Sequence, residues 1–378
     1  MRSKRLPLML LLAAIIFIDQ HIVQAQGITL PQSSPEATIE QEIGIATVKI
    51  VYSRPNVVNQ QGVDRTDKIW GALVPYGFNN LGFGSAEASP WRAGANENTT
   101  IELSHDASIE GKPLSAGKYG LHMAVEESGE VTVIFSQDHT SWGSYFYDEG
   151  KDALRVQVKS EEHASTPMLT YGFVDVDDKV GTVVLDWEKK RIPFKVEFNT
   201  PELVYRNLKA ELQSNQGFSL NNWTAATNYL IQHNIHLDEA LTWANTAVEG
   251  QFFSEKNFRT LQTKSNVLAA MGKADEADKV MAEALSLPTA SITDYYTYGR
   301  QLIGLDKDKQ ALEVFKQANK KWKDHWLAPH GLARGYSALG EYAKALKMEK
   351  EALSRAPEGS KGILQTYVQS LEQNQDFN

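Results

Sequence analysis

The stretch SNVLAAMGKADEADKVMAEAL at residues 265–285 recurs, in altered form, as GRQLIGLDKDKQALEVFKQAN at 299–319 and as ARGYSALGEYAKALKMEKEAL at 333–353. The starts of the three segments are 34 residues apart. A fixed period of this length, with apolar residues at helical spacing, is typical of stacked helical hairpins. The sequence therefore predicts an all-α repeat array in this half of the chain.

Four aligned positions define the repeat, and their residue types indicate how the helices pack. Two hold alanine in every copy, a third holds only small residues, and the fourth holds a large apolar residue. Small side chains allow two helices to cross closely, and a large one fills the space between them. This pattern resembles the tetratricopeptide repeat, a superhelix of helical hairpins. The four positions are Ala277, Ala311 and Ala345; Ala284, Ala318 and Ala352; Ser265, Gly299 and Ala333; and Leu268, Leu302 and Tyr336.

The array extends beyond these three copies on both sides. A looser copy occupies 223–250, with three extra residues at its join, and 359–373 is expected to form a closing helix with a solvent-facing side. Helical spacing begins at Asn199-Thr200-Pro201, where proline suits the first turn of a helix. We therefore assign residues 200–378 to the array.

The tetratricopeptide resemblance implies a concave groove, and such grooves commonly hold peptides or partner proteins. The other possibility is a spacer or dimerisation arm without a specific ligand. The candidate groove residues come from the expected first helices of the hairpins. They are Asn228, Tyr295, Tyr298, Arg300 and Arg334.

The N-terminal half has a different period. Apolar residues recur every second position, as in ATVKIVY at 46–52 and RVQVK at 155–159. Short strands joined by tight turns are typical of all-β domains. The sequence predicts an antiparallel β-sandwich or jelly roll over residues 26–199. The expected turns lie at 128–129, 177–179 and 188–191.

The segment 53–98 breaks this period and is rich in Gly, Pro, Asn and aromatic residues. Loops this long in a compact domain are more often functional than decorative. Several blocks in and around it resemble the domain-of-unknown-function family 2911, whose members are mostly exported proteins of Gram-negative bacteria, often with appended helical repeats. The blocks are LPQSSPEATIEQEIG at 30–44, YSRP at 52–55, GALVPYG at 71–77, WRAGANENTTIE at 91–102, IEGKPLSAGKYGLH at 109–122, VTVIF at 131–135, WG at 142–143 and DALRVQV at 152–158.

The resemblance implies no established activity. This chain also departs from the family pattern, because residues 59–67 and 78–90 expand two of the loops. A site built by those loops is therefore expected to have its own shape.

Polar and aromatic residues in the matching blocks suit two roles. A guanidinium binds carboxylate or phosphate, and an indole stacks on a sugar ring, so a small anionic or glycan ligand is one interpretation. In the other, these residues pair with one another, fill the core and fix long loops to the sandwich. The candidate ligand-binding residues are Arg54, Trp91, Arg92, Asn96, Glu97 and Arg155.

The first 25 residues resemble a cleaved secretory signal. Three basic residues precede an apolar run at 6–18, and Val23-Gln24-Ala25 matches a peptidase recognition site, which places cleavage after Ala25. The apolar run is short of the roughly 20 residues that span a bilayer. We expect a periplasmic or secreted protein with no membrane span after cleavage.

Composition excludes several kinds of chemistry. The chain has no cysteine, which excludes disulfides, thiolate metal sites and cysteine nucleophiles. Its net charge of −9 argues against nucleic acid as a partner. The histidines are scattered without metal-ligand spacing, and no phosphate-binding glycine loop is present. We therefore predict no metal and no cofactor.

These features favour an exported bacterial envelope protein of unknown biochemical activity, whose helical repeats dock a protein or peptide partner. The alternative is an envelope hydrolase, or a carbohydrate-binding or carbohydrate-processing protein, that uses the 53–98 loops. A glycosidase would need a second carboxylate opposite Glu97, and the sequence nominates none. The sequence thus favours a non-enzymatic binding or scaffold role.

Overall fold

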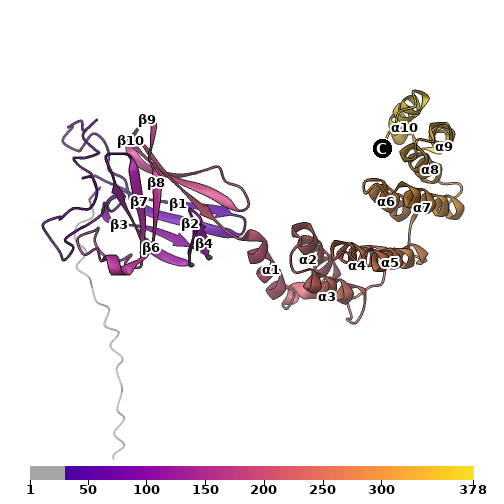
Figure 1. The fold of residues 1–378 in the computed structure, drawn as a ribbon, viewed down its shortest axis with the longest axis horizontal. Coiled ribbons are helices and arrows are strands. Elements are labelled where there is room, and N and C mark those ends of the chain that lie inside the picture. The colour runs from indigo at the N-terminus through magenta and orange to yellow at the C-terminus, as the bar shows by residue number, and fades with distance from the viewer. Residues whose placement is uncertain (1–29) are drawn as a thin grey trace, which may run out of the picture. The chain divides into compact units, whose positions relative to one another are not determined.

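The computed structural model of the protein describes residues 30–378 (Figure 1). The signal sequence expected at 1–25 lies outside the described residues. The chain divides into two compact units, one ending at Phe198 and the other comprising Asn199–Asn378. We call them the β-domain and the array. Among residues 30–378, no helix has both the length and the apolar character that a membrane crossing requires.

The β-domain consists of two antiparallel sheets (Figure 1). The strand order is β1-β2-β3-β6-β7-β8 in the six-stranded sheet and β5-β4-β10-β9 in the four-stranded sheet. A short 3₁₀ helix, η1, at Glu149–Lys151 leads into β8. The strands are β1 (Glu36–Ile43), β2 (Ala46–Ser53), β3 (Ala95–Leu103), β4 (Ala107–Ile109), β5 (Lys112–Leu114), β6 (Gly117–Val125), β7 (Glu130–Ser136), β8 (Asp152–Lys159), β9 (Glu161–Val174) and β10 (Val180–Glu197).

Alternation of residue types lets the strands bury one face. In β2, Ala46, Val48 and Ile50 are fully buried and the residues between them are partly exposed. The buried faces of the two sheets meet, since the ring centres of Phe135 on β7 and Phe194 on β10 lie 5.9 Å apart. The predicted antiparallel β-sandwich is confirmed.

The prediction of a turn at 188–191 is wrong. β10 continues through these residues as one strand paired with β9, with register shifts on both sides of Glu188. Glu188 has a φ of +56°, so the strand accommodates it as a bulge. Arg191 donates two hydrogen bonds of 2.7 Å to the Asp186 carboxylate across this bulge. The four charged residues have the composition of a turn, which explains the wrong prediction. In the structure, residues of this run pair with β9 and continue the strand.

The array consists of helical hairpins (Figure 1). Each pair α2/α3, α4/α5, α6/α7 and α8/α9 forms a hairpin, and α1 and α10 stand at the two ends of the series. The 3₁₀ helix η2 (Asn215–Phe218) follows α1. The helices are α1 (Thr200–Glu211), α2 (Leu220–His233), α3 (Leu237–Val248), α4 (Phe258–Ala270), α5 (Ala274–Ser286), α6 (Ile292–Ile303), α7 (Asp308–Lys321), α8 (Leu327–Ala338), α9 (Tyr342–Arg355) and α10 (Glu358–Glu372).

Small residues lie where the repeat predicts close helix crossings, and residues in the left-handed conformation follow the first helices. A Cβ atom at Gly299 would overlap the ring of Phe315, so α6 and α7 cross where only glycine fits. Gly272 and Gly340 follow first helices with φ values of +78° and +72°, a conformation that glycine adopts without strain. Asp306 stands at the equivalent turn with a φ of +57°. The predicted tetratricopeptide-type array is confirmed.

Candidate functional site

The loops between β2 and β3 enclose a cavity of about 460 Å³. Both expanded loops, 59–67 and 78–90, contribute residues to its lining, and Trp91 and Trp187 complete it. We call this the loop cavity. The segment that breaks the strand pattern in the sequence is therefore the segment that forms this cavity.

Three tryptophans pack together beside and in the cavity wall. Trp91 stacks on Trp187 with ring centres 6.1 Å apart and an interplanar angle of 20°, and Trp70 meets Trp91 edge-on at 5.7 Å. The Trp91 indole donates to the carbonyl of Gly94 at 3.1 Å. Trp187 is 1% exposed, and its indole N–H has no hydrogen-bond partner among residues 30–378. A lining residue of the loop cavity thus carries an unsatisfied buried donor.

Two arginines line the cavity, and both already bind main-chain oxygens. Arg92 donates to the carbonyl of Asn96, and its guanidinium lies 5.0 Å from the ring centre of Tyr145. Arg65 donates to the carbonyls of Asn56 and Val57. These contacts fix both guanidinium groups to the loops and occupy part of their donors.

The described residues that line the loop cavity include no carboxylate, imidazole, thiol or amine side chain. The polar members of the lining are serines, asparagines, glutamines and the two arginines, and the lining includes no Asp, Glu, His, Cys or Lys. General acid–base and covalent catalysis use such groups. The arrangement can hold a ligand by stacking and amide hydrogen bonds, and the lining also includes serine hydroxyls, of which Ser144 lies 3.1 Å from His122 Nδ1.

Three of the candidate ligand residues lie outside the cavity lining and fix loops instead. Arg54 donates to the Leu169 carbonyl at 2.9 Å and to the Thr170 hydroxyl at 2.7 Å, which ties the end of β2 to β9. Asn96 donates to the Ser34 carbonyl at 3.0 Å. Glu97 accepts a long hydrogen bond, 3.4 Å, from Ser53. Of the six candidates, the structure brings Trp91 and Arg92 to the cavity.

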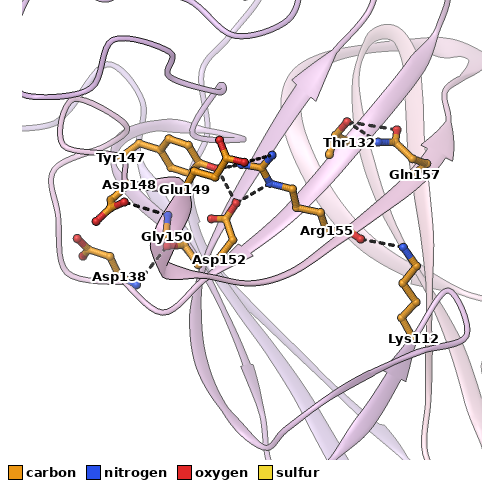
Figure 2. Close-up of polar contacts among 11 residues, drawn as sticks. Lys112, Thr132, Asp138, Tyr147, Asp148, Glu149, Gly150, Asp152, Arg155 and Gln157 are labelled. Carbon is orange, nitrogen blue, oxygen red and sulfur yellow. Dashed lines mark hydrogen bonds and ion pairs between the residues drawn. The ribbon is translucent and has the colours of Figure 1, made fainter.

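Arg155, the remaining candidate, belongs to a separate cluster at the start of β8 (Figure 2). Its guanidinium donates to Asp152 and to the Tyr147 hydroxyl, both at 2.6 Å, and Tyr147 donates to Asp152 at 2.6 Å. Burial raises the pKa of Asp152, although these hydrogen bonds act in the opposite direction. Both of these bonds to Asp152 reach its Oδ2, while its buried Oδ1 has no hydrogen-bond partner among residues 30–378. The cluster fixes the segment that contains Asp148 to the sheet.

A buried histidine lies close to Arg92. His122 on β6 is 2% exposed, and its Nδ1 lies 3.1 Å from the Ser144 hydroxyl. Burial lowers the pKa of His122 to about 4, and the positive charge of Arg92 adds to the effect. The ring is therefore neutral near pH 7, and it serves the packing behind the cavity loops.

In the array, the first helices of successive hairpins carry polar and aromatic residues at matching positions, of which His330 and Arg334 are buried. These residues occur in pairs four apart, and each pair lies 34 residues after the one before it. Hydrogen bonds through Gln301 join the first pair to α6, and the bond between Tyr296 and Arg334 joins the second pair to the third. We call this the first-helix face. Its residues are Gln262 and Asn266 of α4, Tyr296 and Arg300 of α6, and His330 and Arg334 of α8.

Side-chain pairs order the α6–α8 part of this face. His330 Nδ1 lies 2.8 Å from the Glu349 carboxylate, and both side chains are buried. His330 Nε2 lies 3.0 Å from the Tyr296 hydroxyl, which also accepts a 2.8 Å hydrogen bond from Arg334. The Arg334 guanidinium lies 5.2 Å from the ring centre of Tyr367 on α10. Cationic and aromatic groups are thus concentrated at this end of the array.

The candidate groove residues occupy three different environments. Arg300 and Arg334 belong to the first-helix face, Arg300 being exposed and Arg334 only 5% exposed. Asn228 is exposed on α2. Tyr295 lies in the core, where its hydroxyl donates to the Leu285 carbonyl at 2.6 Å, and Tyr298 packs against the same core. Burial raises the pKa of Tyr298 to about 12, and nearby Asp278 adds to the effect.

The structure adds residues that the sequence analysis missed. His330 occupies the repeat position of Tyr296, so applying the 34-residue register to the face itself would have found it. Glu349 carries no such signal, because it lies on a second helix and only its contact with His330 marks it. Trp187 is one of many apolar residues in a long strand, and nothing local distinguishes it.

The family comparison concerns the β-domain. Residues 34–196 match the family model described as "Protein of unknown function (DUF2911)". This confirms the resemblance noted from the sequence blocks. The comparison with curated proteins gave no match.

Solved structures similar to the chain include several tetratricopeptide repeat proteins. One from Parabacteroides merdae ATCC 43184 is 18% identical, with 46% of this chain and 67% of that chain covered and a TM-score of 0.32. A thermophilic TPR protein from Thermus thermophilus is 17% identical, with 46% and 91% covered and a TM-score of 0.31. YrrB, described as a TPR protein with an unusual peptide-binding site, is 18% identical, with 44% and 86% covered and a TM-score of 0.27. The chain joins a region that matches the DUF2911 family model, residues 34–196, to a helical array of tetratricopeptide type built from α1 to α10.

Proposed function

We propose that this protein is an exported, non-enzymatic binding or scaffold protein of the bacterial envelope, and that its array docks a peptide or protein partner. The observation that carries the proposal is the first-helix face, where Tyr296, Arg300, His330 and Arg334 lie together on successive hairpins. Aromatic and arginine side chains dominate the energetics of protein interfaces. The face therefore has the composition of a docking surface.

Charge reversal on this face tests the proposal. Arg300→Glu changes an exposed residue of the face, and Lys309→Glu makes the same change in charge on the exposed surface of α7, the other helix of that hairpin. Tagged full-length proteins would be used to capture partners from a bacterial envelope extract. We expect the wild type and Lys309→Glu to capture the same proteins, and Arg300→Glu to lose them. Equal capture by both variants would exclude the first-helix face as the docking surface.

Export is a separate part of the proposal, and the basic start, the short apolar run and the Ala25 site support it. It is tested by expressing the full chain with its native N-terminus in a Gram-negative host and sequencing the N-terminus of the product. The expected product begins at Gln26 and fractionates with the periplasm or the medium. A cytoplasmic product that retains Met1 would contradict export.

A second binding function is favoured by the loop cavity. Stacked Trp91 and Trp187, the unsatisfied Trp187 N–H and the surrounding amides suit a neutral polyhydroxylated ligand such as a glycan fragment. An anionic ligand suits the cavity less well, because Arg65 and Arg92 already bind main-chain carbonyls.

The cavity proposal is tested by measuring tryptophan fluorescence and melting temperature against neutral and acidic saccharides. Neutral saccharides should raise the melting temperature of the wild type and have no effect on Trp91→Ala. A response to acidic saccharides alone would favour the anionic interpretation. The described lining lacks the carboxylate pair that a glycosidase uses, so the cavity favours saccharide binding over glycoside hydrolysis.

A further inference from the structure

A short segment of the chain lies on the first-helix face. After α10 ends at Glu372, the chain turns at Asn374, which has a φ of +53°, and Asp376–Asn378 returns toward α8. These three residues form neither helix nor strand. We call Asp376–Asn378 the return segment. Each of its residues contacts a side chain or carbonyl of the array.

The aromatic residue of the return segment lies among the aromatic and cationic groups of the face. Phe377 stacks on Tyr367 with ring centres 4.7 Å apart and an interplanar angle of 30°, and its ring centre is 6.1 Å from that of His330. The Arg334 guanidinium lies 5.0 Å from the Phe377 ring centre. The ring therefore meets both a stacking partner and a cation on the face.

Polar contacts flank this ring on both sides. The Asp376 carboxylate accepts a 2.6 Å hydrogen bond from the Ser337 hydroxyl on α8. The Asn378 amide donates to the Arg334 carbonyl at 3.1 Å, and its oxygen accepts from the Arg334 guanidinium at 3.3 Å. A carboxylate, an aromatic ring and a carboxamide therefore each meet a complementary group.

The residues beneath the segment also have contacts within the array itself. His330 is held by Glu349, and Arg334 is held by the Tyr296 hydroxyl. The segment itself is lightly held, since Asp376 and Asn378 are exposed and only Phe377 is half-buried. A receptor fixed by its own contacts, covered by an exposed segment without secondary structure, is suited to exchange of that segment.

We propose that the return segment is an internal ligand that covers the partner site of the array. The partner would present the same chemistry in a short peptide, an aromatic residue between a carboxylate and a carboxamide or similar polar group, and would displace Asp376–Asn378 to bind. This inference rests on the proposed docking function of the first-helix face, and it defines the partner class and a mechanism of competition.

The test uses a fluorescent peptide with the sequence of residues 373–378, QNQDFN, and measures its binding by anisotropy. The receptors are the full-length protein, the chain ending at Asn374, and full-length Phe377→Ala. We expect the shortened chain and Phe377→Ala to bind the peptide at least about tenfold more tightly than the wild type, which corresponds to a site free about a tenth of the time. A peptide with alanine in place of its phenylalanine should not bind.

Melting temperatures separate this inference from a purely structural role of the segment. If the shortened chain and Phe377→Ala remain folded and neither binds the peptide better than the wild type does, the return segment is not a displaceable ligand. If the peptide fails to bind but partner capture still depends on Arg300, the docking function stands and only this inference fails. In the shortened chain, Arg334→Ala should abolish peptide binding, whereas Lys309→Ala should not change it.

Discussion

The loop cavity of the β-domain and the first-helix face of the array hold their polar side chains in different ways. Around the cavity, Arg54, Arg65 and Arg92 donate to main-chain carbonyls. On the face, His330 and Arg334 pair with other side chains. Hydrogen bonds to main-chain carbonyls fix the path of a loop. Hydrogen bonds between side chains order a surface and leave its solvent-facing groups able to bind a partner. The first arrangement maintains a cavity, and the second suits docking.

Breaking the side-chain network of the array should have the largest effect. Glu349→Ala leaves His330 without its buried partner, and the loss of one member of a buried pair costs about 3–5 kcal/mol. We expect the free energy of unfolding of the array to fall by that amount in urea titrations followed by far-ultraviolet circular dichroism.

The matched control for this change is Glu351→Ala on the same helix. Glu351 pairs with Arg355 at the surface, and such pairs contribute about 0.5 kcal/mol. If the two variants lose similar stability, the side-chain network does not order the face as described.

In the β-domain, acid should act through His122. Its pKa of about 4 in the folded protein lies below its usual 6.5, so the unfolded chain binds a proton more readily between these values. Stability contributed by neutral His122 is therefore complete above pH 6.5 and is lost as the pH falls toward 4, by about 3 kcal/mol.

Measuring unfolding of the wild type and His122→Gln from pH 7 to pH 4 checks this prediction. The glutamine amide stays uncharged, so the difference between the two proteins should shrink as the pH falls. If the difference in the free energy of unfolding stays constant across this range, protonation of His122 does not destabilise the β-domain.

Overfilling the helix crossing beneath the first-helix face should have the smallest effect. Gly299→Ala places a methyl group against the Phe315 ring, and overpacking of this kind costs about 1–3 kcal/mol. Gly359→Ala on α10 is the control, because its Cβ has open space and alanine favours the helix. Urea titration should show a loss for the first variant and no loss for the second. If Gly299→Ala and Gly359→Ala are equally stable, α6 and α7 pack less closely at Gly299 than the structure shows.

Sequence reasoning succeeded where a local period repeats. The 34-residue spacing predicts the hairpins and the close helix crossing at Gly299, because each repeat meets neighbours like itself. The period-two pattern predicts the strands in the same way. It does not predict the order of strands in the two sheets, since long-range pairing leaves no local signal.

The sites were harder to predict for the same reason. Arg54 and Asn96 look like ligand-binding residues in the sequence, but their partners are main-chain groups distant along the chain that no motif specifies. Trp187 lies in the cavity wall although its strand is far from the loops in the sequence. The return segment could not have been foreseen, because its fit depends on His330, Arg334 and Tyr367 lying together on two different helices.

The central claim is that a partner docks on the first-helix face, and photocrosslinking in living cells tests it most directly. A photoreactive benzoylphenylalanine would replace Gln301, whose amide bridges to Gln262 and Asn266, or Gln310, which is also exposed, on α7. We expect a discrete crosslinked partner from position 301 and none from position 310. Crosslinks from position 310 alone, or identical crosslinks from both positions, would contradict it.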